Sequence, residues 1–466
     1  MDRFFSGKRA AALTVLILIL AVFLAYSNTI HGAFQFDDET NITKNFLIRD
    51  LANLPEILKG ARGVTMATFS LNYAAGGLNV EGYHIVNISI HALNAVLAYL
   101  LLFNTLILAG AGRGRARMIA AFSALVFALH PVQTQAVTYI VQRMESLSAL
   151  FYLLALLLFA AAVKTHSRRR RFFFYFLVVF SYVLGFYSKE IAVTLPVVIF
   201  LYDLYFAGGG ELGPALRRWP LYLLLAGLMT FFTINTVAPL GGFSDLSKEA
   251  SLVASGVAPG VAPGVIEKSA PTAPPVPNEL SRKGAARPSA GLSGIPADGP
   301  SAGFALSTIS PYDYFLTQSN VLLYYYSLLL VPVNQNVDYD FPVSKGLFET
   351  PVLRSGAVLN IPLPPPALSI TIHLAIIVLA IYLFLKSRGA GRLRGRVASF
   401  FILWFFIILA PTTSFVPIAD VIFEHRLYLS TLAYSTVLII CLEAVFIKVF
   451  GKAEALEKKP FKPSAH

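Results

Sequence analysis

Long apolar segments constrain this chain more than any other feature of its sequence. About 20 apolar helical residues cross the hydrocarbon core of a bilayer. The chain is 56% hydrophobic and only 13% charged, whereas an average soluble domain is about 25% charged. This balance excludes a soluble multidomain enzyme, a disordered chain and a coiled coil. We therefore predict an all-α integral membrane protein with spans at 10–27, 83–109, 118–138, 146–163, 172–188, 190–206, 220–238, 366–385, 397–411 and 427–449.

The basic residues predict the orientation of these spans. The net charge is +12, and much of the excess lies in short runs between apolar segments, at 113–117, 168–171, 217–218 and 386–396. Such runs are typical of cytoplasmic loops, so we do not expect nucleic-acid binding. Basic residues near the start place the N-terminus in the cytoplasm as well. Alternation then places 28–82, 139–145, 188–190 and 239–365 on the outer side.

One segment, Tyr312–Val333, does not fit simple alternation. Its apolar stretch Val321–Val333 is short for a full span. If it crossed the membrane, the basic run 386–396 would lie outside. We therefore expect an interfacial or re-entrant helix, for which the aromatic cluster Tyr324–Tyr326 is suited. The total is then ten spans, or eleven if this segment crosses.

The chain divides into five parts on these grounds. Residues 1–238 form an N-terminal module of seven spans, whose first outer loop is 28–82. Residues 239–311 are rich in Pro, Gly and Ala and are expected to be a disordered outer loop. Residues 312–365 hold the interfacial or re-entrant helix and an outer loop, 366–450 form a C-terminal three-span module, and 451–466 form a cytoplasmic tail.

Three adjacent acids, Asp37, Asp38 and Glu39, open the first outer loop. Adjacent carboxylates repel one another and stay ionised only if they are exposed or compensated by cations. They could cap a helix. They could equally supply a general base or metal ligands at the membrane boundary.

Other polar residues recur at the outer ends of spans. His84, Asn87, His91 and Asn94 share one helix face, which favours either interhelical hydrogen bonding or function. His84 is level with the acids and is a candidate for function. His130 precedes Pro131, which breaks or kinks its helix. Further candidates at outer turns are Arg143, Glu145, Lys189, Glu190, Glu424, His425 and Arg426.

Cations that gather at one end of a bundle would bind an anionic group, for which phosphate is suited. Other kinds of site are not indicated. The sequence has no nucleotide P-loop, no dinucleotide fingerprint, no Gly-x-Ser-x-Gly elbow and no His-Glu-x-x-His motif. The single cysteine, Cys441, excludes an intrachain disulfide and a cysteine zinc cluster.

Six segments, taken in order, resemble the membrane domain of the transmembrane O-mannosyltransferases that carry tetratricopeptide repeats, and their bacterial relatives. They are FQFDDETNITKN, FSLNY with GYHIVNISIHALNAVL, ALHPVQTQAVTYIVQRMESLSALFYLLAL, YSKEIAVTLPVVIFLYD, VPVNQNVDYDFP and FEHRLYLSTLAY. These segments run from about residue 34 to residue 434. Two positions depart from the family pattern, at Arg62–Val64 and at Gln135, and no repeat domain follows the last span.

The resemblance implies a GT-C type glycosyltransferase. Residues 1–238 would then be its catalytic module, inverting hexosyl transfer from a polyprenyl-phosphate sugar its reaction, and a protein or glycan its acceptor. Asp37 and Asp38 would be catalytic. Arg426, Lys189 and Arg143 would bind the donor phosphate, and Glu39, His84, His130, Glu145, Glu190, Glu424 and His425 would position the reactants.

The resemblance also implies O-mannosylation of proteins at the periplasmic face of a bacterial inner membrane. We expect no cofactor, although three adjacent acids leave a divalent metal, Mg²⁺ or Mn²⁺, as an alternative. A second hypothesis is a transporter or flippase of lipid-linked sugars that performs no chemistry. Such a transporter usually shows an internal repeat, and none is evident in the sequence.

Overall fold

The computed structural model describes residues 7–237, 309–355, 359–387, 393–418 and 420–457. The described residues are 77% helical with almost no sheet, which confirms the all-α membrane fold. Most of the predicted disordered loop 239–311 and the end of the predicted tail lie outside the described residues.

The helices coincide closely with the apolar segments. Eleven of them account for the bundle and the helix expected at its boundary: α2 (Lys8–Tyr26), α5 (Val80–Leu108), α6 (Arg113–Leu129), α8 (Arg143–Lys164), α9 (Arg168–Phe186), α10 (Leu195–Tyr202), α12 (Trp219–Val237), α14 (Pro311–Leu330), α15 (Pro366–Lys386), α16 (Leu393–Leu409) and α17 (Tyr428–Glu457). Within the described ranges, six helical segments are long and apolar enough to span a membrane by themselves, and a bent pair makes a seventh.

Short helices extend two of the predicted spans. The bent pair is α6 and the segment Pro131–Thr138, which meet at 54°. The break follows from Pro131, which cannot continue the hydrogen bonding of α6. The chain there makes a 3₁₀ turn, η5 (Pro131–Gln133), then α7 (Thr134–Thr138) and a second turn, η6 (Ile140–Gln142). Likewise α10 is preceded by η7 (Glu190–Thr194) and followed by the π-helical turn η8 (Asp203–Ala207).

Polar caps begin several helices where the sequence changes from loop to apolar run. The side chain of Asn79 accepts a hydrogen bond from the amide of Glu81 at the start of α5. Ser167 caps α9 through the amide of Arg170, and Ser310 caps α14 through the amide of Asp313. These side chains satisfy amides that have no partner within the helix.

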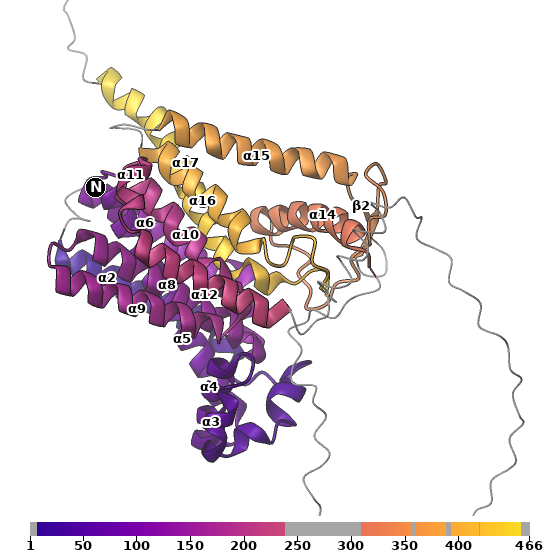
Figure 1. Cartoon of the computed structure of the whole chain (residues 1–466). Helices are drawn as coiled ribbons and strands as arrows, with labels where there is room; N and C mark the ends of the chain where they lie inside the picture. The colour runs from indigo at the N-terminus through magenta and orange to yellow at the C-terminus, as the bar shows by residue number, and fades with distance from the viewer. Residues whose placement is uncertain (1–6, 238–308, 356–358, 388–392, 419, 458–466) are drawn as a thin grey trace, which may run out of the picture.

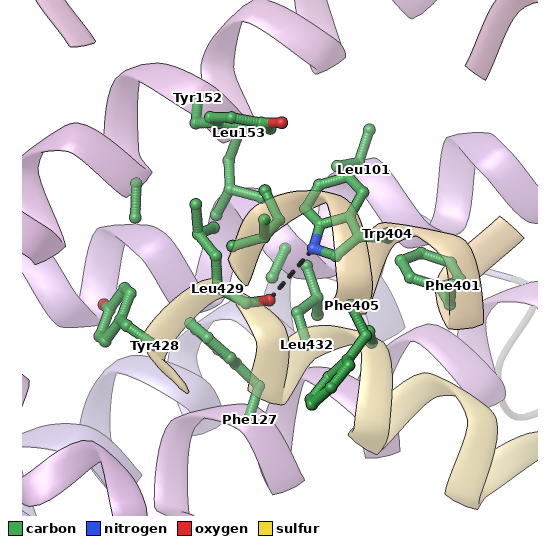
Figure 2. Close-up of a cluster of buried hydrophobic side chains, with 14 of the residues drawn as sticks. Leu101, Phe127, Tyr152, Leu153, Phe401, Trp404, Phe405, Tyr428, Leu429 and Leu432 are labelled. Carbon is green, nitrogen blue, oxygen red and sulfur yellow. Dashed lines mark hydrogen bonds between the residues drawn. The ribbon is translucent and has the colours of Figure 1, made fainter. Parts of the chain in front are cut away.

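Apolar and aromatic side chains from α5, α6, α8, α16 and α17 form the core of the bundle. Figure 2 shows Trp404 between Leu101, Leu153 and Phe401, with its Nε1 donating to the carbonyl of Leu429 at 3.2 Å. Trp404 is fully buried, and its only polar atom has a partner. The contact ties α16 to the first turn of α17, where the Glu424–Arg426 segment enters the bundle.

The basic connections gather at one end of the bundle, which we call the basic end. Glu443 on α17 pairs there with Arg115 on α6 and with Arg394 on α16, the latter at 3.1 Å. The guanidinium of Arg117 donates to the carbonyl of Gly7 at 3.0 Å. We call the opposite end, which carries residues 28–82, the loop end. It holds the short helices η2 (Glu39–Thr43), η3 (Leu47–Arg49), η4 (Leu51–Asn53), α3 (Leu54–Ile57) and α4 (Gly63–Gly76) (Figure 1).

The helix α14 lies against the loop end of its neighbours. Its residue Asn320 accepts from Ser369 at 2.6 Å, and the carbonyl of Ser319 lies 2.8 Å from His373 Nε2; both partners are in the first turns of α15. Tyr326 contacts Phe405 near the end of α16. A hairpin of β1 (Val352–Ser355) and β2 (Leu359–Pro362) lies at the same end (Figure 1). These contacts support the proposal of a re-entrant or interfacial α14.

Cysteine labelling tests this topology. In a Cys441→Ser background, Lys59→Cys at the loop end is expected to react with a membrane-impermeant thiol reagent added outside. Lys386→Cys, at the end of α15, is expected to react only after the membrane is permeabilised. Both side chains are exposed, so access alone decides the result. Labelling of Lys386→Cys from outside would show that α14 crosses the membrane.

Candidate active site

A cavity of about 320 Å³ lies at the loop end and is lined mainly by charged and other polar side chains. The first loop, the turn before α10 and the segment 411–426 form its walls. Its carboxylates are Asp37, Glu145, Glu190 and Asp420, and its cations are Arg62, Lys189 and Arg426. His425 also lines it, so the structure brings six of the sequence-predicted residues together: Asp37, Glu145, Lys189, Glu190, His425 and Arg426.

A strained turn presents Asp37 to the cavity. Phe36, directly before it, has a left-handed backbone with φ of 45°, a conformation that residues other than glycine rarely adopt. The amide of Asp37 donates to the hydroxyl of Tyr139 at 2.8 Å, and its carbonyl accepts from the amide of Asn41 at 3.0 Å. Backbone strain of this kind is held by surrounding contacts and is frequent at functional sites.

Arg62, which lines the cavity, also has a left-handed backbone, at φ of 58°. Its guanidinium forms a bidentate pair with Glu190, in which Nε and Nη2 each lie 3.0 Å from a carboxylate oxygen. Burial lowers the pKa of Arg62, but the charge and hydrogen bonds of Glu190 outweigh it and the net effect is to raise this pKa. Arg62 is therefore charged and already neutralised by one carboxylate.

Lys189 forms the second ion pair of the cavity. Its Nζ lies 2.8 Å from Glu145, whose side chain is fully buried, and 3.3 Å from the Gln142 side-chain oxygen. Burial lowers the pKa of Lys189, and Glu145 opposes this shift. Removing one partner of a buried ion pair strongly destabilises a protein, because the other charge is left uncompensated.

Arg426 differs from these two cations. Backbone carbonyls hold its guanidinium: Nη2 donates to Asp420 at 2.7 Å, and Nη1 donates to Val421 at 3.1 Å. Within the described part of the chain, no carboxylate oxygen lies within 4.0 Å of Arg426. The carbonyls orient the charge without neutralising it, which leaves Arg426 able to pair with an anion.

His425 is oriented by a single side chain. Its Nδ1 lies 3.1 Å from Gln135 Oε1, and its amide donates to the same oxygen at 2.7 Å. Because an amide oxygen only accepts, Nδ1 carries the hydrogen and Nε2 is left as an acceptor. The ring stacks on Phe423 at a centroid distance of 4.9 Å. Gln135 thus has a positioning role although it departs from the family pattern.

Two of the strongest sequence candidates do not line this cavity. Asp38 is 1% exposed, and its carboxylate accepts from the amides of Val141 at 2.7 Å and Gln35 at 3.0 Å. Arg143 is 0% exposed; it donates to the side-chain oxygens of Asn87 and Asn72, both at 2.6 Å. Asp38 thus fastens the first loop to the turn before α8, and Arg143 ties α5 to α4.

The remaining sequence candidates lie around the cavity rather than in it. Glu39 pairs with Lys44 at 2.6 Å on the exposed side of the loop. His84 Nε2 contacts the carbonyl of Gly32, and His130 Nε2 contacts that of Leu329, each at 3.0 Å. Glu424 accepts from the amide of Asn336, from Gln335 Nε2 and from the hydroxyl of Tyr339. These contacts hold the loops that surround the site.

Sequence reasoning left two cavity residues without a role. Arg62 was noted only as a departure from the family pattern, and Asp420 lies in a loop that no motif marks. Partial desolvation raises the pKa of Asp420, Arg426 opposes the shift, and the charge of Asp37 adds to it. The one sequence signal for Asp420 is its position six residues before Arg426, close enough for its carbonyl to hold that guanidinium.

The buried carboxyl of Asp38 predicts a pH dependence of stability. Burial raises the pKa of Asp38 from 3.8 to about 6, despite the hydrogen bonds from Gln35 and Val141. A raised pKa means that the folded state binds the proton more tightly than the unfolded state, so its contribution to stability is lost as the pH rises through about 6. As the pH falls from about 7 to about 5, the free energy of unfolding of the wild type should increase by about 1 kcal/mol relative to that of Asp38→Asn. Thermal unfolding of both proteins measures this difference, and parallel pH profiles would contradict it.

Comparison with known proteins agrees with the family resemblance of the sequence motifs. Protein O-mannosyl-transferase Tmtc1 of Drosophila melanogaster is 33% identical over 148 residues, which are 28% of this chain and 16% of that protein. Human Protein O-mannosyl-transferase TMTC4 is 32% identical over 156 residues, or 28% of this chain and 21% of that protein. Human TMTC3 is 26% identical over 245 residues, or 48% of this chain and 25% of that protein.

Parts of this chain are similar to the TMTC-type protein O-mannosyltransferases. The expected family resemblance is thereby confirmed. The matched region spans between 16% and 25% of the length of these three relatives. No family model matches the sequence, and no solved structure matches the protein.

Proposed function

We propose that this protein transfers a mannose-like sugar from a polyprenyl-phosphate carrier to an acceptor hydroxyl, on a protein, at the loop end of the bundle. The observation that carries the proposal is that Asp37 and Arg426 line one cavity, and that no carboxylate among the described residues lies within 4.0 Å of Arg426. The names of the relatives support mannosyl transfer to protein. The basic end, where cytoplasmic loops are expected, supports an outer, periplasmic site in a bacterial inner membrane.

The chemistry follows from these two groups. The carboxylate of Asp37 accepts the proton of the acceptor hydroxyl as its oxygen attacks the anomeric carbon of the sugar. A new carbon–oxygen bond forms while the bond from that carbon to the carrier phosphate breaks, and its electron pair leaves with the phosphate. Attack from the side opposite the leaving group inverts the anomeric configuration.

Arg426 supplies the stabilisation that the leaving group requires. Negative charge on the carrier phosphate increases as the bond breaks, and preorganised cations that meet such charge are often the largest catalytic contribution. Lys189 lines the same cavity, and its ion pair with Glu145 partly neutralises its charge. Arg62, paired with Glu190, extends the positive wall of the cavity. Arg143 acts through Asn87 and Asn72 on the helices that carry the site.

The other polar groups have positioning roles in this proposal. Asp38 fixes the loop, so that Asp37 faces the cavity, while Glu145 holds Lys189 and Glu190 holds Arg62. His425, oriented by Gln135, would position the reactants. Among the described residues no group of three His, Cys, Asp or Glu side chains is arranged to hold a metal ion. The proposal assigns neutralisation of the phosphate to Arg426, Lys189 and Arg62, which line the cavity.

Purified protein incubated with radiolabelled polyprenyl-phosphate mannose tests the proposal. We expect label to leave the carrier and to appear on an acceptor polypeptide, at the same rate with and without EDTA. A carrier that keeps its label with every hexose and every acceptor would refute glycosyl transfer. Loss of activity in EDTA that Mg²⁺ or Mn²⁺ restores would refute the assignment to the cations alone.

A further inference from the structure

A second and larger cavity, of about 760 Å³, lies at the basic end, away from the candidate active site. It lies between α9 and the start of α12, beside the short helix α11 (Leu212–Leu216). Its volume is within the range of about 300–1,000 Å³ that is usual for ligand sites. None of the residues that line it has a role in the proposed transfer.

Three arginines, Arg171, Arg217 and Arg218, line this cavity. Only Arg218 has a carboxylate partner: its Nη1 lies 3.0 Å from both oxygens of Asp203, and it also donates to the carbonyl of Pro214. Arg171 donates to the carbonyl of Thr165 at 3.1 Å. Among the described residues, no carboxylate lies within 4.0 Å of Arg171 or Arg217. The cavity therefore carries two uncompensated positive charges.

Most of the rest of the lining is apolar, and part of it faces outward. Phe172, Phe176 and Leu224 line the cavity and are 77%, 61% and 51% exposed, respectively. Trp219, at the start of α12, is 61% exposed. A tryptophan between arginines and a spanning helix is typical of the boundary between the polar headgroups and the hydrocarbon core.

We propose that this cavity binds an anionic phospholipid of the inner leaflet. Its phosphate would pair with Arg171 and Arg217, and its acyl chains would lie along Phe172, Phe176 and Leu224. Guanidinium groups form bidentate hydrogen bonds with phosphate. Basic pockets between spanning helices on the cytoplasmic side are suited to anionic headgroups.

The polar and apolar parts together favour a lipid over other anions. A free phosphate or a nucleotide would use the arginines but leave the exposed aromatic wall uncovered, whereas a phospholipid meets both. The Arg218–Asp203 pair, to which the hydroxyl of Tyr222 also donates, ties α12 to the turn after α10. Bound lipid would therefore cover the contact between α12 and the turn after α10, which this ion pair already holds together.

Native mass spectrometry of the full-length protein with dioleoyl phosphatidylglycerol tests the proposal. We expect one tightly bound lipid, and roughly 10-fold weaker binding or more in Arg171→Gln/Arg217→Gln, because each basic residue near the surface contributes about a fivefold effect. Leu224→Trp, which fills the apolar groove without changing charge, should also weaken binding. Dioleoyl phosphatidylcholine should bind no better to the wild type than to the double variant.

The matched control is Arg168→Gln/Arg169→Gln, which removes the same amount of charge, from the turn of α9 that carries Arg171, at residues that do not line the cavity. This control should bind phosphatidylglycerol as the wild type does. Equal losses in the two double variants would show that net charge alone attracts the lipid and would overturn the proposal. So would displacement of phosphatidylglycerol by polyprenyl phosphate at equal concentration, which would assign the cavity to the carrier. Thermal unfolding in phosphatidylcholine confirms that each variant is folded.

Discussion

Replacing Asp37 by asparagine is expected to lower the rate of sugar transfer by about 10²–10⁴-fold, the usual contribution of a general base. Asparagine keeps the shape of the side chain but cannot accept the proton. The backbone hydrogen bonds of Asp37 with Tyr139 and Asn41 are kept in the variant. The asparagine oxygen can still accept from the Tyr139 hydroxyl, which also contacts the Asp37 side chain, so the turn should persist. Steady-state kinetics with a radiolabelled donor give the rate, and donor binding should change little because Arg426 is intact.

The neighbouring acid and a distant one provide the controls. Asp38→Asn removes a carboxylate that fastens the loop, so we expect a smaller loss of rate accompanied by a loss of stability. Glu56→Gln changes an exposed carboxylate of the same loop, which pairs only with Lys59 at 3.3 Å, and should have no effect. Because neighbouring carboxylates can exchange roles, the Asp37→Asn/Asp38→Asn variant is measured as well. Near-full activity in all three aspartate variants would show that Asp37 and Asp38 only cap a helix and have no role in catalysis.

Replacing Arg426 by alanine is expected to weaken donor binding first. A hydrogen bond to a charged group contributes about 1.5–3 kcal/mol, so the KM for the donor should rise roughly 10- to 100-fold. The rate constant kcat should also fall, since the same charge stabilises the leaving phosphate. Kinetics over a range of donor concentrations separate the two effects.

Two further variants make this result specific. Arg426→Lys keeps the charge but loses the planar fork that Asp420 and Val421 hold, so it should restore binding only in part. Lys345→Ala removes an exposed cation near the loop end that does not line the cavity and should leave the KM unchanged. An Arg426→Ala enzyme with wild-type KM and kcat would place the donor phosphate elsewhere, with Lys189 and Arg62 as the next candidates.

The helical architecture was predictable because it depends on patterns that are local in sequence. The predicted spans 10–27 and 366–385 differ from α2 and α15 by at most two residues at each end. The break at Pro131 was predictable because proline cannot donate within a helix. The hairpin of β1 and β2 and the short helices of the first loop were not predicted, because no strong periodicity marks them.

The site was predictable in part, and the reason lies in helix geometry. Polar residues at the loop ends of several spans necessarily lie at one end of the bundle, which is why Lys189 and Arg426 line the same cavity. Which way each side chain points around its helix or turn depends on tertiary packing. For this reason Arg143 is directed between α5 and α4, Asp38 is directed away from Asp37, and Arg62, whose backbone is left-handed, enters the cavity instead.

The central claim is that the cavity performs chemistry on a lipid-linked sugar and does not merely move it. Proteoliposomes that contain radiolabelled polyprenyl-phosphate mannose and an acceptor peptide test this most directly. Two quantities are measured: the side of the membrane on which the label lies, and whether the lipid or the peptide carries it. We predict that the wild type moves label from lipid to peptide and that Asp37→Asn leaves it on the lipid. Label that changes sides at equal rates in both proteins while staying on the lipid would contradict this account and show a transporter.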